Sequence, residues 1–341
     1  MVKLSVLDQT PVIQGHTAAD AVAATIDLAQ LADDLGYTRY WCAEHHGLYG
    51  VANPAPEVML ARLGSVTRRI RLGSGGVMLP YYTPFKIAEQ FRMLEALFPN
   101  RIDLGVGRAP GGDMKTAQAV AGGHYNYGEQ FPQQVADLVG LFNGALPADH
   151  LARGVLLQPQ IATQPQLWML GSSEFGGLLA AKLGIRFAFA HFINAQYGEA
   201  VAAAYRDRFE TGHESTAYLA VAIFVICADT EAEAIGARKG GRSATRADGA
   251  RPQRADSLDR TRRESTIRAA RSRDHRAAEG AQHHRHARAG RRTDPCDQQR
   301  FGADELIVLT VAAVMRRARA PTSYWPRHSI CPGSPPSTDP A

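Results

Sequence analysis

Stretches rich in apolar and β-branched residues alternate along residues 1–235 with stretches whose apolar residues recur every three or four positions. Short apolar runs between polar turns are typical of buried strands, and the longer period is typical of helices with one buried face. The predicted strands are residues 3–7, 37–42, 70–77, 102–106, 166–170, 186–190 and 219–227. The predicted helices are residues 18–35, 56–67, 84–97, 132–142, 174–183 and 197–210.

Helix-end signals support these boundaries. Thr17 is placed to cap the first predicted helix and Gly36 to end it, because a threonine hydroxyl accepts from free N–H groups and glycine tolerates the left-handed turn after a helix. Pro56 and Pro84 begin helices, where a missing N–H costs little.

Strands that alternate with helices require a parallel sheet. The first four strands begin at residues 3, 37, 70 and 102, and residues 304–311 supply an eighth strand. Eight such units predict an α/β fold of the (β/α)8 TIM-barrel type. A doubly wound sheet is the alternative. A Rossmann domain of that class carries a G-x-G-x-x-G motif after its first strand, and this sequence has none there.

The positive charge of the chain is concentrated in one segment. The 341 residues carry a formal net charge of +5, but residues 1–235 carry −6, residues 236–300 carry +10 and residues 301–341 carry +1. A nucleic-acid or membrane-surface partner, which a basic chain invites, would therefore depend on residues 236–300 alone.

That segment is unlike the rest of the chain. It holds 17 Arg and one Lys, and Leu258 and Ile267 are its only large apolar residues, so it cannot bury enough surface to fold. Because apolar periodicity stops abruptly and returns at FGADELIVLTV, we hypothesise that residues 236–300 are a frameshifted translation. A disordered basic linker is the alternative. The HHRH tract at residues 283–286 is interpreted as part of this biased composition.

The chain is therefore predicted to divide into four parts. Residues 1–235 form strands one to seven of the barrel, residues 236–300 are the Arg-rich segment, residues 301–313 hold the eighth strand, and residues 314–341 are a disordered tail. The barrel is expected to be incomplete or disordered between its seventh and eighth strands.

Cysteine spacing and hydropathy indicate the compartment. The four cysteines, at positions 42, 227, 296 and 331, include no C-x-x-C pair and predict neither a zinc ribbon nor a disulfide framework. The N-terminus lacks the apolar core of a signal peptide, and no run is long enough to span a membrane. We expect a cytoplasmic protein with no membrane partner.

Candidate site residues follow from the barrel, because barrel active sites lie at the carboxyl ends of strands. Glu44, His45 and His46 follow the second strand. Histidine accepts or donates protons near neutral pH, and adjacent strand-end residues point to opposite sides, so only one of the two histidines is expected to face the mouth. A structural histidine is the alternative, and the set is too small to predict a metal site.

Arg108 follows the fourth strand beside Gly105 and Gly107, an arrangement that suits an anion such as phosphate; a salt bridge at the rim is the alternative. Ser172 and Ser173 precede the helix predicted at 174–183, whose free N–H groups form an anion site or, alternatively, receive an ordinary serine cap.

Four segments carry a more specific signal together than apart. They occur in order on successive strand ends: WCAEHHGLYG, NPAPEVMLARLGSVTRRIRLGSGGVMLPYYTPFKIAEQ, PNRIDLGVGRAPGGD and MLGSSEFGGLLAAKLG. These segments resemble the bacterial luciferase-like monooxygenase family, in particular its single-chain, alkanal-monooxygenase-like members. The resemblance covers residues 3–235 and returns at 302–311.

The resemblance implies an oxidoreductase that binds reduced FMN, supplied by a separate flavin reductase, and uses dioxygen to oxygenate a small organic substrate such as an aldehyde. It implies that His45 is the catalytic base and that Arg108, Ser172 and Ser173 hold the flavin phosphate. It also implies that Glu44 contributes to the cofactor site.

Members of the family carry a non-prolyl cis peptide under the flavin ring where Gly75 and Gly76 stand here. A homodimer is a further expectation. No metal is implied.

Three alternative functions stay open at this point. The protein could be a related barrel that uses a deazaflavin coenzyme, an inactive flavin-binding protein, or a nucleic-acid binder that acts through residues 236–300. Because flavin oxygen chemistry requires the exclusion of water, the Gly-rich stretch 111–130 is predicted to be a lid. The predicted apolar lining of the mouth is Met78, Leu79, Tyr81, Tyr82 and Phe192.

Overall fold

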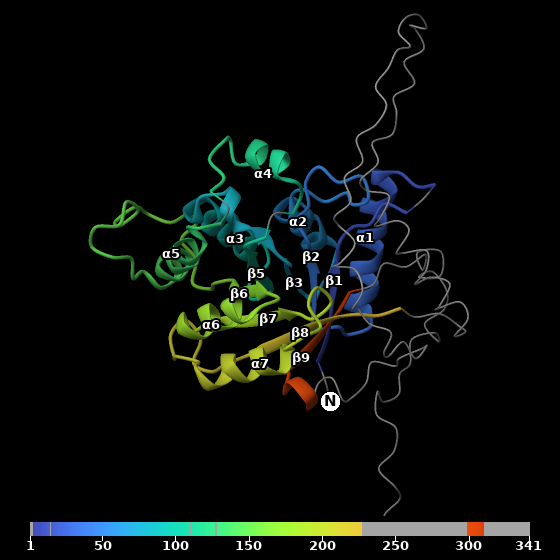
Figure 1. Ribbon diagram of the computed structural model, residues 1–341. Coiled ribbons are helices and arrows are strands. Elements are labelled where there is room, and N and C mark those ends of the chain that lie inside the picture. The colour runs from blue at the N-terminus through green and yellow to red at the C-terminus, as the bar shows by residue number, and fades with distance from the viewer. Residues whose placement is uncertain (1–2, 14, 110, 127, 227–298, 310–341) are drawn as a thin grey trace, which may run out of the picture.

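The computed structural model describes residues 3–226, apart from residues 14, 110 and 127, together with residues 299–309. In this part of the chain, parallel strands form a barrel with helices on its outside (Figure 1). The order around the barrel is β3-β2-β1-β9-β8-β7-β6-β5-β4, and β3 also pairs with β5, which closes the ring. The predicted (β/α)8 barrel is confirmed, and the alternative of an open, doubly wound sheet is excluded.

The strands are β1 (Lys3–Asp8), β2 (Arg39–Cys42), β3 (Arg71–Ser74), β4 (Val77–Met78), β5 (Ile102–Gly107), β6 (Gln166–Gly171), β7 (Arg186–Ala190), β8 (Leu219–Phe224) and β9 (Glu305–Leu309). The helices are α1 (Ala18–Asp34), α2 (Pro56–Val66), the short 3-10 helix η1 (Leu79–Tyr81), α3 (Pro84–Leu97), α4 (Met114–Val120), α5 (Phe131–Asn143), α6 (Glu174–Lys182) and α7 (Gly198–Asp207).

The ends of α1 show how local sequence sets these boundaries. The Thr17 hydroxyl accepts a hydrogen bond from the Asp20 N–H, and the Asp20 carboxylate accepts one from the Thr17 N–H, which is a complete capping box. Gly36 follows the helix with φ +78°, a left-handed conformation that favours glycine. Both predicted signals are confirmed.

The third barrel strand consists of two pieces, whereas the sequence predicted one strand over residues 70–77. β3 and β4 both pair with β5, and the cis peptide between Gly75 and Gly76 separates them. η1 and α4 were not predicted, because both are short and lie among prolines or glycines.

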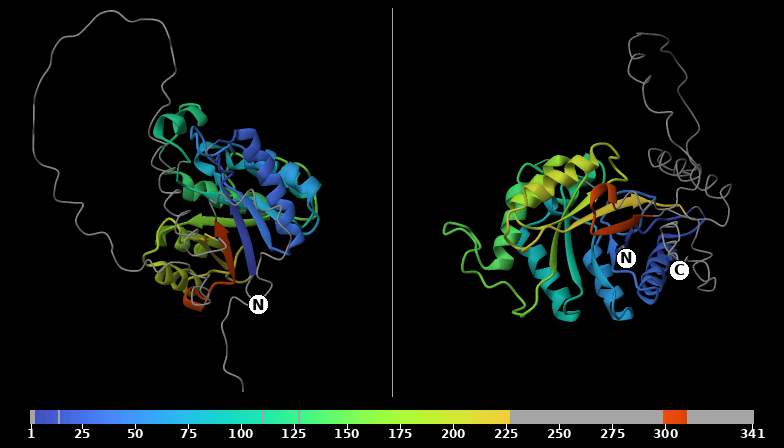
Figure 2. Two further views of the ribbon diagram at one scale, coloured as in Figure 1. Left: turned by 90° about the vertical axis from the view of Figure 1, so that its right-hand side faces the viewer. Right: turned by 90° about the horizontal axis from the view of Figure 1, so that it is seen from below.

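β9 completes the barrel by pairing with β8 on one side and β1 on the other (Figure 2). Ile307, for example, lies opposite Ser5 in β1 and Ala222 in β8. The predicted eighth strand is therefore confirmed. The predictions for residues 314–341, and for all but the last two residues of 236–300, lie outside the described residues.

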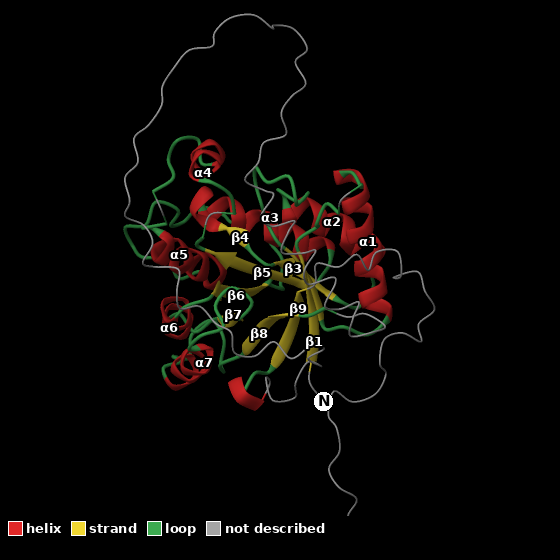
Figure 3. Cartoon of the chain, turned by 45° about the vertical axis from the view of Figure 1, so that its right-hand side comes forward, coloured by secondary structure: helices red, strands yellow, loops and turns green. Residues whose placement is uncertain are grey.

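Helices surround the ring of strands (Figure 3). Buried apolar side chains form one layer between the helices and the strands and another inside the barrel. The outer layer is the larger and joins faces of α1, α2, α3, α5, α6 and α7 to the strands. The inner layer consists of Leu7, Trp41, Ala43, Trp168, Ala188, Ala220, Ala222, Ile307 and Leu309.

The floor of the barrel, near the amino ends of the strands, is charged rather than apolar. The buried Arg39 guanidinium donates to Asp103 at 2.7 Å and to both carboxylate oxygens of Glu305 at 2.7 and 3.0 Å. Burial opposes ionisation of Asp103, but Arg39 and Arg71 outweigh it and hold the pKa of Asp103 below its ordinary value. The network joins β2, β5 and β9 across the barrel axis.

Within the described part of the chain, none of the helices combines the length and apolar character needed to cross a membrane.

Candidate active site

Candidate residues gather at the end of the barrel opposite the N-terminus, where α4 stands apart from the ring of helices (Figures 1 and 2). They follow β2, β3 with β4, β5 and β6, which are neighbours around the ring. Strand order therefore places the E-H-H segment, the Gly-Gly peptide, Arg108 and the two serines at neighbouring strand ends.

Glu44 is the most fully engaged of these side chains. Its carboxylate, 1% exposed, accepts hydrogen bonds from the Tyr82 hydroxyl at 2.7 Å and from the Met78 N–H at 2.8 Å, and it lies 2.7 Å from His46 Nε2. A buried carboxylate needs hydrogen-bond partners of this kind. Contact of Glu44 with a cofactor stays a prediction, and its carboxylate is already occupied by protein groups.

His45 makes no side-chain hydrogen bond to Glu44 or His46 among the described residues, and the expectation that the two histidines face opposite sides stays a prediction. Its Nδ1 atom is buried and has no hydrogen-bond partner among the described residues. Burial lowers the pKa of His45, an effect that the Glu44 charge opposes and the His46 charge reinforces. The imidazole is therefore neutral at physiological pH and offers one unprotonated nitrogen.

The backbone around His45 is fixed from outside the motif. The His45 N–H donates to the Asn53 carbonyl at 3.1 Å, and the Asn53 amide donates to the Ala43 carbonyl at 3.1 Å. Asn53 is itself buried. Sequence reasoning missed this residue, since a lone asparagine in a loop carries no distinctive signal.

The Gly75–Gly76 peptide is cis, as the family resemblance implied. A Cβ at Gly76 would lie 2.8 Å from the Gly105 carbonyl oxygen, and one at Gly105 would lie 2.2 Å from the Ser74 carbonyl oxygen. β5 therefore approaches the end of β3 and the Gly75–Gly76 peptide at a distance that only glycine allows. This packing explains the glycines, while cofactor contact at Gly75 and Gly76 stays a prediction.

Arg108 is exposed, and its side chain packs on an aromatic ring instead of forming an ion pair with a carboxylate among the described residues. Its guanidinium carbon lies 4.6 Å from the centroid of the Phe175 ring on α6, a cation–π contact. A Cβ at Gly128 would lie 2.9 Å from Arg108 Cγ, so the backbone there closes on the side-chain stem. No carboxylate of the described residues pairs with Arg108, so the alternative of a rim salt bridge is not observed there.

Ser172 and Ser173 lie at the start of α6. Ser173 occupies the N-cap position, but its side chain makes no capping hydrogen bond. The Ser172 carbonyl accepts from the Asn194 amide at 3.0 Å, which ties this turn to the loop after β7. The first N–H groups of α6 therefore lack a side-chain cap, and together with Arg108 they suit an anionic group.

The predicted lid, residues 111–130, packs directly on the E-H-H segment. The His46 N–H donates to the Gly111 carbonyl at 3.1 Å, and a Cβ at Gly112 would lie 2.5 Å from the His46 carbonyl oxygen. Farther along, Tyr125 packs on Tyr81 with ring centroids 5.4 Å apart. Tyr81, Ala117 and Tyr125 form a buried apolar cluster next to this segment.

Three of the five predicted lining residues belong to this cluster or pack against it. Met78 and Tyr82 pack against the buried cluster of Tyr81, Ala117 and Tyr125. Phe192 packs on the inner layer of the barrel, whereas Leu79 belongs to the outer layer and does not fit the prediction.

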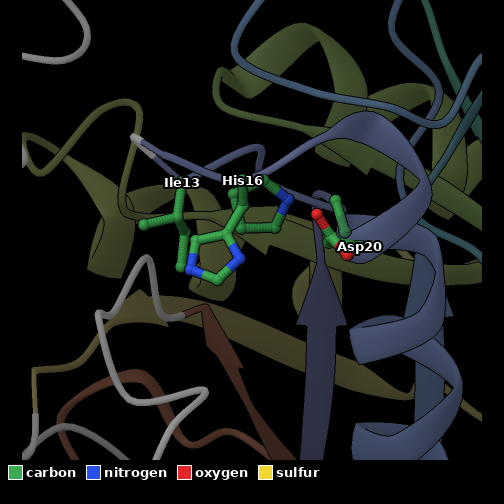
Figure 4. A pocket seen from close by; sticks show the side chains of 5 residues that line it. Ile13, His16 and Asp20 are labelled. Carbon is green, nitrogen blue, oxygen red and sulfur yellow. The ribbon is translucent and has the colours of Figure 1, made fainter.

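The hollow in Figure 4 is a separate feature, located between the loop after β1 and the start of α1. Ile13, His16 and Asp20 line it, together with Pro11 and Ala21. The Asp20 carboxylate already accepts from Thr17, and this hydrogen bond lowers the pKa of Asp20. We assign the hollow no role.

The described residues contain no group of three or more His, Cys, Asp or Glu side chains arranged to hold a metal ion. Cys42 is a buried free thiol.

Tyr82 is the most informative residue that sequence reasoning placed only in the lining. Burial and then the Glu44 charge raise the pKa of Tyr82 well above its ordinary value, so the phenol remains a donor. The paired tyrosines of VMLPYYTP, just after a strand end, are the signal that pointed to it.

Comparison with known proteins agrees with this geometry. The model of the luciferase-like monooxygenase family matches residues 2–308. The chain is 47% identical to the Bacillus subtilis protein YceB, itself uncharacterized, over 235 residues, which are 69% of this chain and 71% of YceB. It is 42% identical over 237 residues to the N-acetyl-S-alkylcysteine monooxygenase of the same organism, covering 68% of this chain and 70% of that protein.

A solved structure extends the similarity to the fold. The crystal structure of apo-MsnO8 is 32% identical and covers 94% of this chain and 96% of its own, with a TM-score of 0.72. The chain therefore belongs to the luciferase-like monooxygenase family and is an oxidoreductase of the monooxygenase type.

Proposed function

We propose that the protein binds reduced FMN at the mouth of the barrel and uses dioxygen to oxygenate a small organic substrate. One observation carries this proposal: among the described residues, a neutral, buried histidine whose Nδ1 has no partner follows β2, while an arginine without an acidic partner and a helix start without a side-chain cap follow β5 and β6 at the same end of the barrel. The first is suited to proton transfer and the second to a phosphate.

The residues fit FMN in two respects. Arg108 and the N–H groups at Ser172 and Ser173 supply the positive partners that a terminal phosphate needs. Gly107, at the end of β5, has no side chain, and among the described residues a Cβ there would meet only Met78 Cε, at 3.6 Å, so a ligand can approach the backbone at this strand end.

Bound FMN supplies the reducing electrons and the reaction with dioxygen. The protein contributes binding and proton handling: Arg108 anchors the phosphate and so sets the position of the ring, and His45 accepts a proton at Nδ1. The cover made by Tyr81, Tyr82 and Tyr125 keeps water from the reacting centre.

The organic substrate is proposed by class only. The resemblance that placed the chain among alkanal-monooxygenase-like proteins favours an aldehyde, whereas the relative named N-acetyl-S-alkylcysteine monooxygenase favours a thioether. Both are small molecules with an apolar chain, which agrees with the apolar cover over the mouth. We therefore propose a panel of alkanals and S-alkylcysteine derivatives.

Two partners belong to the proposal. A separate reductase supplies reduced FMN, and the chain forms a homodimer through α2 and α3, which expose Val58, Met93 and Leu97. A supply of reduced flavin and the free thiol of Cys42 support a cytoplasmic location. Sedimentation of the full chain tests the dimer.

The function is tested by titrating the full-length protein with reduced and oxidised FMN, then measuring oxygen uptake with the substrate panel. His45→Ala is expected to lose turnover and keep FMN binding. Arg108→Ala is expected to weaken FMN more than riboflavin, because only FMN carries the phosphate. Binding of a deazaflavin coenzyme in preference to FMN, or flavin binding without oxygen uptake, would refute the proposal.

A further inference from the structure

The carboxylate of Glu44 has no part in the proton transfer or phosphate binding proposed above, yet it is the most heavily bonded group of the mouth. One of its oxygens accepts from both His46 Nε2 and the Tyr82 hydroxyl at 2.7 Å, and the other accepts from the Met78 N–H at 2.8 Å. It lies between β2, which precedes the E-H-H segment, and the segment after the cis peptide.

This arrangement fixes which nitrogen of His46 carries the proton. An ionised carboxylate only accepts hydrogen bonds, so the His46 nitrogen facing it must donate. In the neutral imidazole one ring nitrogen carries the proton and the other does not. Donation from Nε2 to Glu44 therefore leaves Nδ1 as the acceptor of the His46 ring.

Two further contacts hold the ring in place. Tyr81 stands edge-on to the His46 ring, with centroids 5.8 Å apart and planes at 73°. The His46 N–H donates to the Gly111 carbonyl at 3.1 Å, which anchors the main chain to the lid. The side chain is 13% exposed, so the ring is packed but not sealed.

The two adjacent histidines thus differ in kind. His45 is buried with an unpartnered Nδ1, whereas His46 is paired with a carboxylate in the manner of an orienting acid beside a catalytic base.

We propose that Glu44 is a positioning residue that locks His46 in the Nε2–H tautomer, so that His46 Nδ1 is a second proton-accepting atom at the mouth. Tyr82 supports the same carboxylate. This inference rests on the proposed function for the role of that atom in turnover, but the tautomer itself is a property of the protein without cofactor.

A structural tie between β2 and the segment after β4 would use the same hydrogen bonds, and the test must separate the two roles. Glu44→Gln keeps the size of the side chain and loses the obligatory acceptor, since an amide both donates and accepts. Glu57→Gln is the matched control. Burial and then the Glu44 charge raise the pKa of Glu57, so this carboxyl is close enough to Glu44 to be affected by its charge, but it makes no described hydrogen bond to His46.

The experiment records long-range proton–nitrogen correlation spectra of the histidine rings in the full-length protein at alkaline pH, with assignment by His46→Gln. The wild type and Glu57→Gln are expected to show a protonated Nε2 and an unprotonated Nδ1 at His46. Glu44→Gln is expected to show a mixture of tautomers. In the same variant, turnover at saturating substrate is expected to fall roughly 10- to 100-fold while FMN affinity stays within about twofold.

The spectra and the turnover together decide whether Glu44 fixes the tautomer of His46. A wild-type His46 protonated at Nδ1 overturns the inference, and so does a Glu44→Gln variant with mixed tautomers and undiminished turnover. If Glu44→Gln fails to fold, Glu44→Asp provides the second test, because its shorter side chain keeps the charge but withdraws the carboxylate from His46 Nε2. A partial loss of tautomer purity then supports the inference, and an unchanged spectrum with unchanged turnover contradicts it. Failure of the wild type to bind FMN refutes the proposed function instead, and the ring spectrum still decides the tautomer.

Discussion

Replacing Glu305 by glutamine tests whether β9 belongs to the folded barrel. The Glu305 carboxylate accepts from Arg39 at 2.7 and 3.0 Å, from Tyr218 at 2.9 Å and from the Ser5 hydroxyl. Glutamine keeps the shape and removes the charge, so the buried guanidinium of Arg39 loses one of its two acidic partners. The other, Asp103, remains at 2.7 Å.

The magnitude follows from burial. The side chains of Arg39 and Glu305 are 3% and 0% exposed, so solvent cannot replace the missing charge. Removing one partner of a buried pair costs about 3–5 kcal/mol, and the surviving Asp103 places this case at the low end, about 3 kcal/mol. For a domain of this size, that corresponds to a fall in melting temperature of about 6–12 °C.

The assay is equilibrium unfolding in urea, followed by the fluorescence of Trp41 and Trp168, both fully buried inside the barrel. Asp34→Asn is the control, since the Asp34–Arg68 pair is mostly exposed and should contribute less than about 1 kcal/mol. If Glu305→Gln unfolds at the same urea concentration as the control, β9 does not close the barrel and the reasoning is wrong.

Three further predictions concern single residues. Burial lowers the pKa of His45, so folding disfavours its protonation. The free energy of unfolding, measured in urea at several pH values, should therefore fall as the pH drops below about 6.5. The fall should be smaller in the His45→Gln variant. Gly105→Ala should destabilise the fold by about 1–3 kcal/mol in the same assay, because its Cβ would lie 2.2 Å from the Ser74 carbonyl oxygen. Phe175→Leu should weaken FMN about two- to fivefold and leave riboflavin unchanged in parallel titrations, through loss of the ring under Arg108; equal weakening of both would contradict it.

The barrel could be predicted because each strand is short, apolar and followed by a helix with recognisable ends. Strand β6, for example, begins at the predicted residue, Gln166, and α3 matches its predicted bounds, Pro84–Leu97. α4 escaped prediction because MKTAQAV is a short helix among glycines, and its position depends on packing against Tyr81 and Tyr125. Tertiary contacts of this kind leave little trace in a single sequence.

The site was predicted by strand order but not in its internal connections. The sequence indicated that Glu44, His45 and His46 lie at one strand end and that the two histidines face different ways. The Glu44 carboxylate accepts hydrogen bonds from the Tyr82 hydroxyl and the Met78 N–H. These bonds depend on the path of the chain after the cis peptide, which no local sequence pattern encodes. The frameshift hypothesis for residues 236–300 is tested by resequencing the gene, since an intact reading frame would contradict it.

The position of β9 has a consequence for how the chain reaches its folded state. Arg39 and Glu305, which share the bidentate contact on the barrel floor, are 266 residues apart in sequence. Until residues 305–309 have left the ribosome, β1 and β8 each have one edge with unpaired backbone groups. Ring closure is therefore a step that follows synthesis of residues 305–309, and a nascent chain halted before β9 would carry two open edges prone to aggregation.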